Sequence, residues 1–506
     1  MYALIFADNK YQANRMGILR APGAHRIATH LRRQNINTEV IDFYLDWTLD
    51  ELKEIIDNQL SLPTLFIGFS CSLMFDGIDN FISIRNYIKE KNPNVPIVIG
   101  GNKTLQKGFQ SADYYIEGTG ESAITALVDY LQQKSQTLVY KDINGNKILD
   151  SLTDYKVNSI KGLDIEYLPS DFINPDEVLS LETARGCIFK CAFCDFPGIG
   201  KNKLDYLRDR DEIVAELTKN YRNNGTTKYF IVEDTINDTD DKCEMLAEIA
   251  SMLPFELSLM GYMRADLLIS KPKNLDYLMQ AGFKGMHFGL ETFNEQAGKI
   301  IGKGMPSSRL KEGLIDIKRR YPNLHTTSTF IVGLPYETRE EILKSLDWLV
   351  DSKALDFWSF NPLIIPRRDP TVHHSYFTDN YRLYGYNVMP KEEVQSRQSE
   401  LDGTAFGLKW WRNIIYWQSK TFDYISAAKF VTEISQKSYQ YRKIDGWSAF
   451  AMSGLGYELS ELFQKSYNGK NKINDELLKQ QSNEYIKKYK QQKLNFIKSI
   501  DKLDKL

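Results

Sequence analysis

The chain of 506 residues carries 64 Lys and Arg against 66 Asp and Glu, so its net charge of −2 gives no reason to expect nucleic acid or an anionic membrane as a partner. Its length allows two or three domains, and no apolar run approaches the roughly 18 residues that span a membrane. The first residues lack the basic segment of a signal peptide. The odd number of five cysteines argues against a disulfide framework and for a reducing, cytoplasmic location.

Residues 1–135 alternate short apolar runs with amphipathic helical segments. The runs at 2–8, 38–44, 64–70, 95–101 and 113–118 predict a doubly wound parallel sheet. Ligands of such sheets bind at the carboxyl ends of the strands. The cofactor-binding residues expected at those ends are Ser70, Ser72, Gly100, Gly101, Gly118 and Gly120.

The alternation is interrupted over residues 136–177, which we interpret as a linker. Within it, "YKDINGNKIL" predicts a small hairpin with an Asn-Gly turn.

A second alternating series fills residues 178–370. Its six strands are expected at 178–185, 228–234, 256–263, 284–290, 326–333 and 355–364. This repeat predicts a partial (β/α)6 barrel with its catalytic face at the carboxyl ends of the strands. Residues 371–506 follow as a mainly helical, aromatic-rich C-terminal region, which we expect to cap the barrel.

Three of the five cysteines lie in one short loop, directly after the first barrel strand. The segment "RGCIFKCAFC" places Cys187, Cys191 and Cys194 with three and two residues between them. Three thiolates can hold three irons of a 4Fe–4S cubane and leave the fourth iron open. Structural zinc sites and ferredoxins both need four ligands, and no second cysteine pair is present. The remaining Cys71 and Cys243 are expected to be buried apolar side chains.

This loop resembles that of the radical S-adenosylmethionine (SAM) superfamily, including an aromatic residue, Phe193, before the third cysteine. Four later segments resemble the branch of that superfamily with an N-terminal cobalamin-binding-type domain. They are "YFIVEDTIND" at 229–238, "GYMRADLL" at 261–268, "GMHFGLETFNEQAGKIIGKG" at 285–304 and "FIVGLPYETREE" at 330–341.

The resemblance implies an enzyme whose 4Fe–4S cluster cleaves SAM and generates a 5′-deoxyadenosyl radical that abstracts hydrogen from the substrate. It implies a reductant such as flavodoxin or ferredoxin. Phe193, Gly333 and Leu334 would lie near the adenine, Glu291 and Thr292 near the ribose, Glu233 and Asp234 near the methionine amino group, and Arg264 near the carboxylate. A helix cap at Asp234 or Thr235 and a surface salt bridge at Arg264 are the structural alternatives.

Residues 1–135 also resemble the cobalamin-binding-type domain, but whether cobalamin binds is left open. The loop "ADNKYQANRMGILRAPG" lacks the histidine that ligates cobalt in some cobalamin proteins. If cobalamin binds, we expect methyl transfer to be the reaction. If it does not, we expect a cyclisation, a rearrangement or an oxidation. A methylthiotransferase is disfavoured, because that family holds a second three-cysteine cluster where this chain offers only Cys71.

The substrate, a small molecule or a peptide, is not readable from the sequence. The segment "IIPRRDPTVHH" offers Arg367, Arg368, His373 and His374 to an anionic substrate, or is a solvated loop. A non-catalytic iron–sulfur sensing protein on the same fold is the alternative from another functional class.

Overall fold

The computed structural model describes residues 1–9, 17–71, 78–101, 109–151, 153–157, 160–194, 207–368, 375–402, 404, 406, 414–466 and 475–503. The chain forms two compact units. Unit 1 comprises Met1–Ser180, Asp211–Thr226 and Asp475–Leu506. Unit 2 comprises Leu181–Arg210 and Thr227–Asn474. The bounds of these units differ from those of the four segments 1–135, 136–177, 178–370 and 371–506. The function expected of each segment stays a prediction.

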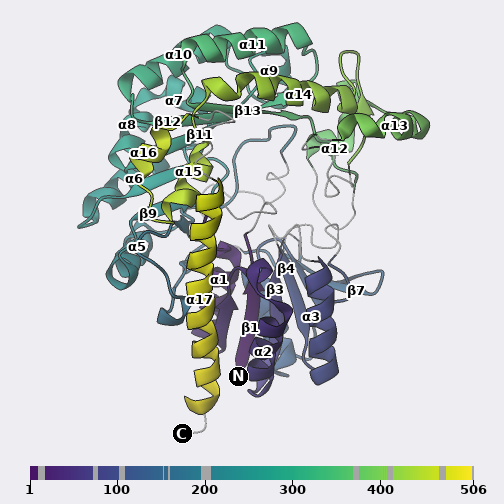
Figure 1. The fold of residues 1–506 in the computed structure, drawn as a ribbon, viewed down its shortest axis with the longest axis vertical. Helices are drawn as coiled ribbons and strands as arrows, with labels where there is room; N and C mark the ends of the chain where they lie inside the picture. Colours follow the sequence, from purple (N-terminus) through teal and green to yellow (C-terminus); the bar gives the residue numbers. More distant parts are fainter. Residues whose placement is uncertain are drawn as a thin grey trace. The chain divides into compact units, whose positions relative to one another are not determined.

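Unit 1 is built on a seven-stranded sheet in the order β2-β1-β3-β4-β5-β7-β6 (Figure 1). Its strands are β1 (Tyr2–Ala7), β2 (Asn37–Ile41), β3 (Thr64–Ser70), β4 (Ile97–Gly101), β5 (Tyr114–Glu117), β6 (Lys141–Ile143) and β7 (Asn146–Asp150). All pairings are parallel except β6 with β7, which confirms the predicted doubly wound sheet. The predicted hairpin is also present, but β7 pairs with β5, so the hairpin extends the sheet.

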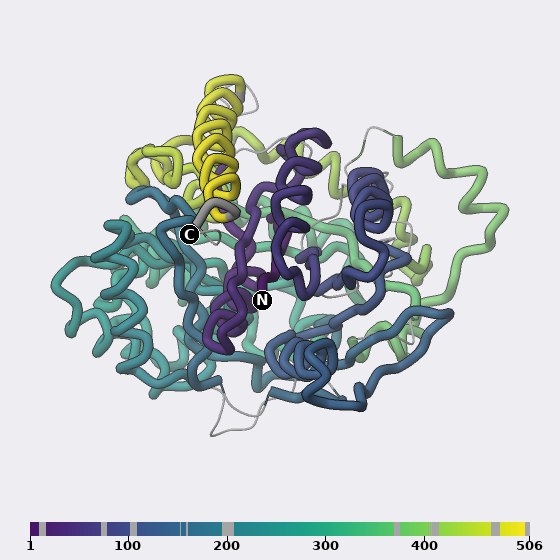
Figure 2. The backbone as a smooth tube through the Cα atoms, turned by 90° about the horizontal axis from the view of Figure 1, so that it is seen from below, coloured from purple at the N-terminus to yellow at the C-terminus, as the bar shows by residue number. Residues whose placement is uncertain are grey.

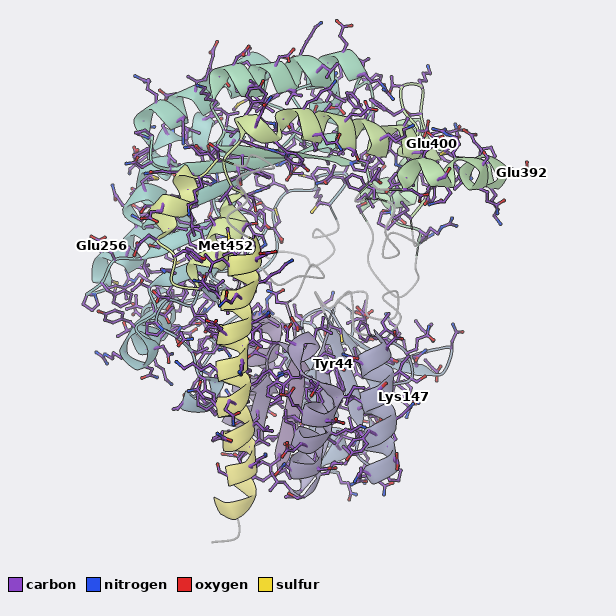
Figure 3. The ribbon with its side chains drawn as sticks, viewed as in Figure 1. Tyr44, Lys147, Glu256, Glu392, Glu400 and Met452 are labelled. Carbon is purple, nitrogen blue, oxygen red and sulfur yellow. The ribbon has the colours of Figure 1, made fainter. Side chains whose placement is uncertain are left out.

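The helices of unit 1 are α1 (Pro22–Arg33), α2 (Leu49–Leu60), α3 (Ile78–Lys91), α4 (Glu121–Leu131), α5 (Arg210–Asn224) and α17 (Asp475–Leu503). The apolar faces of α1 and α4 share one core with the sheet. Tyr44, labelled in Figure 3, is buried against Phe6 and Phe69. The sheet therefore has a packed core on both of its sides, as a doubly wound fold requires.

The last helix, α17, packs along α2, and Figures 1 and 2 both show the C-terminal helix beside the N-terminal segments. Buried polar contacts fasten it: Lys493 Nζ lies 2.6 Å from Glu39 Oε2, and Tyr489 accepts a 3.0 Å hydrogen bond from the amide of Asp42. Tyr485 donates to Glu177, a buried residue that also pairs with Arg20. These contacts explain why α17 and the segment before residue 180 pack in unit 1.

Unit 2 contains a six-stranded sheet in the order β13-β12-β11-β10-β9-β8. The strands are β8 (Leu179–Leu181), β9 (Lys228–Ile231), β10 (Ser258–Met263), β11 (Phe283–Glu291), β12 (His325–Val332) and β13 (Phe357–Pro362). The pairings from β9 to β13 are parallel, and consecutive strands are neighbours. This is the predicted partial barrel.

Helices α6 (Asp240–Met252), α7 (Ala265–Ser270), α8 (Pro272–Gln280), α9 (Glu295–Ile301), α10 (Ser307–Arg320) and α11 (Arg339–Ser352) connect the strands. The remainder is mainly helical: α12 (Tyr376–Asn380), η4 (Tyr381–Tyr384), α13 (Lys391–Arg397), η5 (Gln398–Leu401), α14 (Tyr424–Ser438), α15 (Gly446–Ser453) and α16 (Leu459–Gln464). Figure 1 shows α10 and α11 on the outer side of the curved sheet, and α15 packs against β10, β11 and β12.

Within the region after residue 370, which was expected to be mainly helical, two short segments form strands instead. β15 (Trp417–Gln418) pairs antiparallel with β14 (Asn387–Val388). The indole nitrogen of Trp417 donates a 2.7 Å hydrogen bond to the carbonyl of Leu363, which fixes this short strand near the end of β13. None of the described helices combines the length and hydropathy needed to cross a membrane.

Candidate active site

The cysteine loop begins where β8 ends, and backbone geometry holds it in place. Gly186 has a φ of +85°, a conformation that favours glycine. The amide of Ala192 donates a 3.2 Å hydrogen bond to the carbonyl of Ile301 at the end of α9. The amide of Cys194 donates to the carbonyl of Cys191 at 3.1 Å, so the last two cysteines share one tight turn.

The three loop cysteines are half-buried free thiols, whereas Cys71 and Cys243 are buried, as predicted. Cys187 Sγ lies 3.5 Å from Thr235 Oγ1, and Cys191 Sγ lies 3.7 Å from Arg264 Nη1. Burial raises the pKa of Cys191, while Lys303 and Arg264 oppose that rise. Thiols near two cations are suited to binding iron as thiolates, so the donor set fits a 4Fe–4S cluster.

No three His, Cys, Asp or Glu side chains within the described ranges gather around a position for a single metal ion. A cubane does not require such a group, because each cysteine binds a different iron.

Glu233 follows β9, as expected, but its carboxylate is occupied within the protein. It is buried and accepts hydrogen bonds from the amides of Thr183 and Ala184, at 2.6 and 2.7 Å, and from the Thr183 hydroxyl. It also pairs with the buried Lys242. The geometry therefore favours a role in anchoring the chain before the cysteine loop, and its predicted SAM contact stays a prediction.

Asp234 is half-buried beside Glu233, and the hydroxyl of Thr235 donates to its backbone carbonyl. Helix α6 begins later, with Thr239 at its N-cap, so the alternative of a helix cap at Asp234 or Thr235 is wrong.

Arg264 directly follows β10 and turns toward the cysteine loop. Its guanidinium lies 4.1 Å from the ring centre of Phe189 and donates to Asp266 through Nη2 at 2.6 Å. Its backbone amide donates to Asn237 at 2.9 Å. This buried arginine is more than a surface salt bridge, because it combines a ring contact, a carboxylate and a cysteine sulfur.

Glu291 and Thr292 end β11, where the backbone bends sharply. Glu291 has a φ of +67°, and its Oε1 lies 3.9 Å from Lys303 Nζ. The hydroxyl of Thr292 donates to Glu337, which also accepts from the amide of Leu334 at 3.2 Å. Burial raises the pKa of Glu337 to about 8. Sequence analysis did not single out Glu337, although it lies in the "GLPYETREE" segment.

Gly333 and Leu334 follow β12, and the C-terminal region packs against Gly333. The hydroxyl of Tyr386 donates to the Gly333 carbonyl at 2.7 Å. A Cβ added to Gly333 would lie 2.4 Å from Trp417, and the φ of this glycine is +96°. Glycine is thus required here for contact with an indole as well as for backbone conformation, and no local pattern pointed to either partner.

In unit 1 the predicted strand ends do meet. Ser70 aligns with Gly100, and Gly101 aligns with Glu117, so β3, β4 and β5 end at one edge. Gly101 and Gly118 have φ values of +139° and +92°, and a Cβ added to Gly100 would meet nothing within 4 Å.

The other two residues predicted at this edge, Gly120 and Ser72, are not shown to line it. A Cβ added to Gly120 would lie 3.0 Å from Ile27, so this glycine lets α1 approach α4. Ser72 lies outside the described residues.

Among the remaining candidates, Phe193 lies half-buried in the turn before Cys194. Arg367 and Arg368 are exposed; Arg367 donates to the carbonyl of Ile414, and Arg368 lies 3.6 Å from Asp379. His373 and His374 lie outside the described residues. No structural feature therefore distinguishes these two arginines as substrate contacts.

Known proteins that resemble this chain are radical SAM proteins or methyltransferases. Residues 181–349 match the model of the Radical SAM superfamily. A protein of Pyrococcus horikoshii described as an uncharacterized methyltransferase is 24% identical over 342 residues, 64% of this chain and 71% of its own. The tRNA-2-methylthio-N(6)-dimethylallyladenosine synthase of Natranaerobius thermophilus is 22% identical over 55% of this chain and 61% of its own length.

Solved structures extend the similarity in fold to nearly the whole chain. The radical SAM methyltransferase TsrM of Kitasatospora setae, solved with cobalamin and a 4Fe–4S cluster, aligns with a TM-score of 0.61 at 14% identity, covering 96% of this chain and 99% of TsrM. The cobalamin-dependent radical SAM enzyme OxsB aligns with a TM-score of 0.53 at 15% identity, covering 99% of this chain and 80% of OxsB.

Proposed function

We propose that this radical SAM enzyme is a cobalamin-dependent methyltransferase that acts on a small molecule or a peptide in the cytoplasm. The observation that carries the proposal is the similarity in fold, over 96–99% of the chain, to TsrM and OxsB, two enzymes solved with cobalamin. That similarity includes unit 1, which a radical SAM domain alone does not need. The relative from Pyrococcus horikoshii, described as a methyltransferase, supports the same class of reaction.

The residues of unit 2 would bind and orient the cofactors. Cys187, Cys191 and Cys194 would hold the cluster and leave one iron for SAM. Arg264, fixed by Asp266 and Phe189 beside Cys191, would attract the SAM carboxylate. When bound, the cluster supplies the electron that cleaves SAM, and cobalamin supplies a methyl carrier. Flavodoxin or ferredoxin would be the reductant.

At the carboxyl edge of the unit 1 sheet, glycine backbone rather than side chains would contact cobalamin. Gly100, Gly101 and Gly118 leave the strand ends uncovered by side chains of their own. The sequence from Ala7 to Gly23 holds no histidine. His25 is fully buried, with Nε2 2.9 Å from Asp42. Cobalamin would therefore bind without an axial histidine from this loop.

A methylthiotransferase remains disfavoured, although such enzymes are among the relatives. Their N-terminal domains hold a second cluster on three cysteines, while unit 1 has only the buried Cys71.

The test is anaerobic purification, reconstitution with iron and sulfide, addition of cobalamin, reduction, and incubation with SAM. We expect SAM cleavage by the wild type and none by the Cys187→Ala, Cys191→Ala, Cys194→Ala variant. We also expect tightly bound cobalamin, scored by its visible spectrum, in both proteins. SAM cleavage without bound cobalamin would favour a cobalamin-free cyclase or oxidoreductase. A complete cluster that never cleaves SAM would favour a sensing protein.

A further inference from the structure

Three aromatic residues from the region after the barrel pack together beside the cysteine loop and the loop after β12. They are Phe377 in α12, Tyr386, which directly precedes β14, and Trp417 in β15, and we call them the aromatic bracket. All three side chains are buried. The Tyr386 ring lies 5.8 Å from the Phe377 ring and 5.1 Å from the Trp417 ring, measured between ring centres. The aromatic bracket is therefore one packed group.

The aromatic bracket contacts the cysteine loop through Phe377. The amide of Phe377 donates a 2.8 Å hydrogen bond to the carbonyl of Ala192, which lies in the turn between the second and third cysteines. Ala192 is buried, and its own amide donates to the carbonyl of Ile301. Because both bonds join backbone groups, they fix the peptides of the loop and do not depend on a side-chain rotamer.

The aromatic bracket contacts the loop after β12 at Gly333. The hydroxyl of Tyr386 donates a 2.7 Å hydrogen bond to the carbonyl of Gly333, and the indole of Trp417 occupies the space that a Cβ would need. This close approach and a φ of +96° both require glycine. A glycine is also the residue with the widest choice of backbone conformations, so the orientation of this peptide has to be fixed by other groups.

The barrel sheet in turn anchors the aromatic bracket. Trp417 pairs with Val388 in the short ladder of β14 and β15, and its indole nitrogen donates a 2.7 Å hydrogen bond to the carbonyl of Leu363, directly after β13. Because these bonds connect the aromatic bracket to the sheet, the Tyr386 hydroxyl is a fixed donor against which the Gly333 peptide is held.

We propose that Tyr386 is a positioning residue for SAM, whose hydroxyl holds the Gly333 peptide in the orientation that the adenine requires. This inference deepens the proposed function and rests on it for a SAM whose adenine lies near Gly333 and Leu334. Without the hydroxyl, the buried Gly333 carbonyl loses its hydrogen bond from Tyr386. The unoccupied loop then adopts further conformations, and SAM binding is weakened because it has to order the loop again.

The experiment measures SAM binding to the reconstituted holoenzyme with its cluster kept oxidised, because an oxidised cluster cannot donate the electron that cleaves SAM. Equilibrium dialysis with isotopically labelled SAM gives its Kd. Displacement of that SAM by methionine gives the inhibition constant of a probe that has the amino and carboxylate groups but no adenine.

The variant Tyr386→Phe removes only the hydroxyl of the ring. We expect the Kd for SAM to rise roughly three- to tenfold, within the range that one net hydrogen bond gives. The inhibition constant of methionine and the iron content should stay at the wild-type values, because neither depends on the loop after β12. A general loss of structure would change all three quantities.

Tyr424→Phe is the matched control. Tyr424 is also fully buried, and its ring centre lies 6.4 Å from that of Trp417, but its hydroxyl has no hydrogen-bond partner among the described residues. This variant should keep the wild-type Kd for SAM. A second variant, Trp417→Phe, loses the bond to Leu363 and shrinks the ring against Gly333. It should weaken SAM and spare methionine, and it provides the same comparison if Tyr386→Phe takes up no cluster.

Three results would overturn the inference: an unchanged Kd for SAM in Tyr386→Phe, an equal loss of SAM and methionine binding, or an equal loss in Tyr386→Phe and Tyr424→Phe. Failure of the proposed function gives a different result. The predicted difference between SAM and methionine without methyl transfer to cobalamin would reject the proposed function and keep the positioning role of Tyr386. Methyl transfer by a Tyr386→Phe variant with the wild-type Kd would reject the positioning role and keep the proposed function.

Discussion

The two sheets differ in the residues that lie at the carboxyl ends of their strands. In unit 2, charged and sulfur-containing side chains crowd the carboxyl ends of the strands, and most are already engaged, as Glu233 with Lys242 and Arg264 with Asp266 show. In unit 1, β3 and β4 end in Ser70, Gly100 and Gly101, while the carboxylates at the ends of the neighbouring strands, Asp8, Asp42 and Glu117, are buried. Under the proposed function, the edge of unit 2 would hold the cluster and SAM through cysteine and arginine side chains, and the edge of unit 1 would hold cobalamin against glycine backbone.

The largest effect is expected at the edge of unit 2, from Glu233→Gln. The variant keeps an acceptor for the amides of Thr183 and Ala184 but removes the nearer carboxylate from the buried Lys242, whose other carboxylate partner, Asp238, lies 3.7 Å away. Breaking a buried ion pair costs about 3–5 kcal/mol, so urea unfolding should show a loss of this order together with a lower iron content. If stability is unchanged and only the Kd for SAM rises, Glu233 contacts SAM as the sequence suggested.

A smaller effect concerns Glu337, the buried carboxyl that joins Thr292 to the turn after β12. Its pKa is raised to about 8, so the folded state binds more protons than the unfolded state between about pH 4.5 and 8. This group therefore makes the wild type less stable as pH rises through that window, by at most about 1.4 kcal/mol per pH unit. The variant Glu337→Gln should remove this slope from urea unfolding measured between pH 5 and 8. Equal slopes in the two proteins would show that the carboxyl is already ionised.

The smallest effect is expected at the edge of unit 1, from Gly101→Val. Valine would be strained at a φ of +139° and would place methyl groups at the strand end. We expect the Kd for cobalamin to rise about tenfold, equivalent to about 1.4 kcal/mol, while the cluster content stays at the wild-type value.

Gly145→Val is the matched control for this variant. Gly145 also has a positive φ, +81°, but it precedes β7, which runs parallel to β5, so it lies at the opposite edge of the sheet. Gly145→Val should lower stability and leave cobalamin binding unchanged. Equal losses of cobalamin in both variants would mean that strain, and not the edge, controls binding.

Local patterns predicted the strands and helices of both sheets, because hydrophobic periodicity reports which face of an element is buried. They did not predict that β7 joins the first sheet or that α17 packs in unit 1. Those arrangements depend on pairs far apart in the chain, such as Tyr489 with Asp42 and Lys493 with Glu39. No sequence pattern close to any of these residues indicates its distant partner.

For the candidate site, the sequence predicted the cysteine loop and the position of Arg264, because both rest on short motifs. It missed Trp417 and Tyr386 against Gly333, since these contacts come from the region after the barrel.

The most direct test of the central claim follows the methyl group of SAM. Reconstituted holoenzyme with cobalamin would be reduced with dithionite, in place of flavodoxin or ferredoxin, and incubated anaerobically with SAM carrying a deuterated methyl group. The bound cobalamin would then be analysed by mass spectrometry. We predict label on cobalamin in the wild type and none in the triple cysteine variant that still binds cobalamin. Cobalamin that binds but stays unlabelled in a wild type with a complete cluster, under conditions where SAM is consumed, would contradict the account.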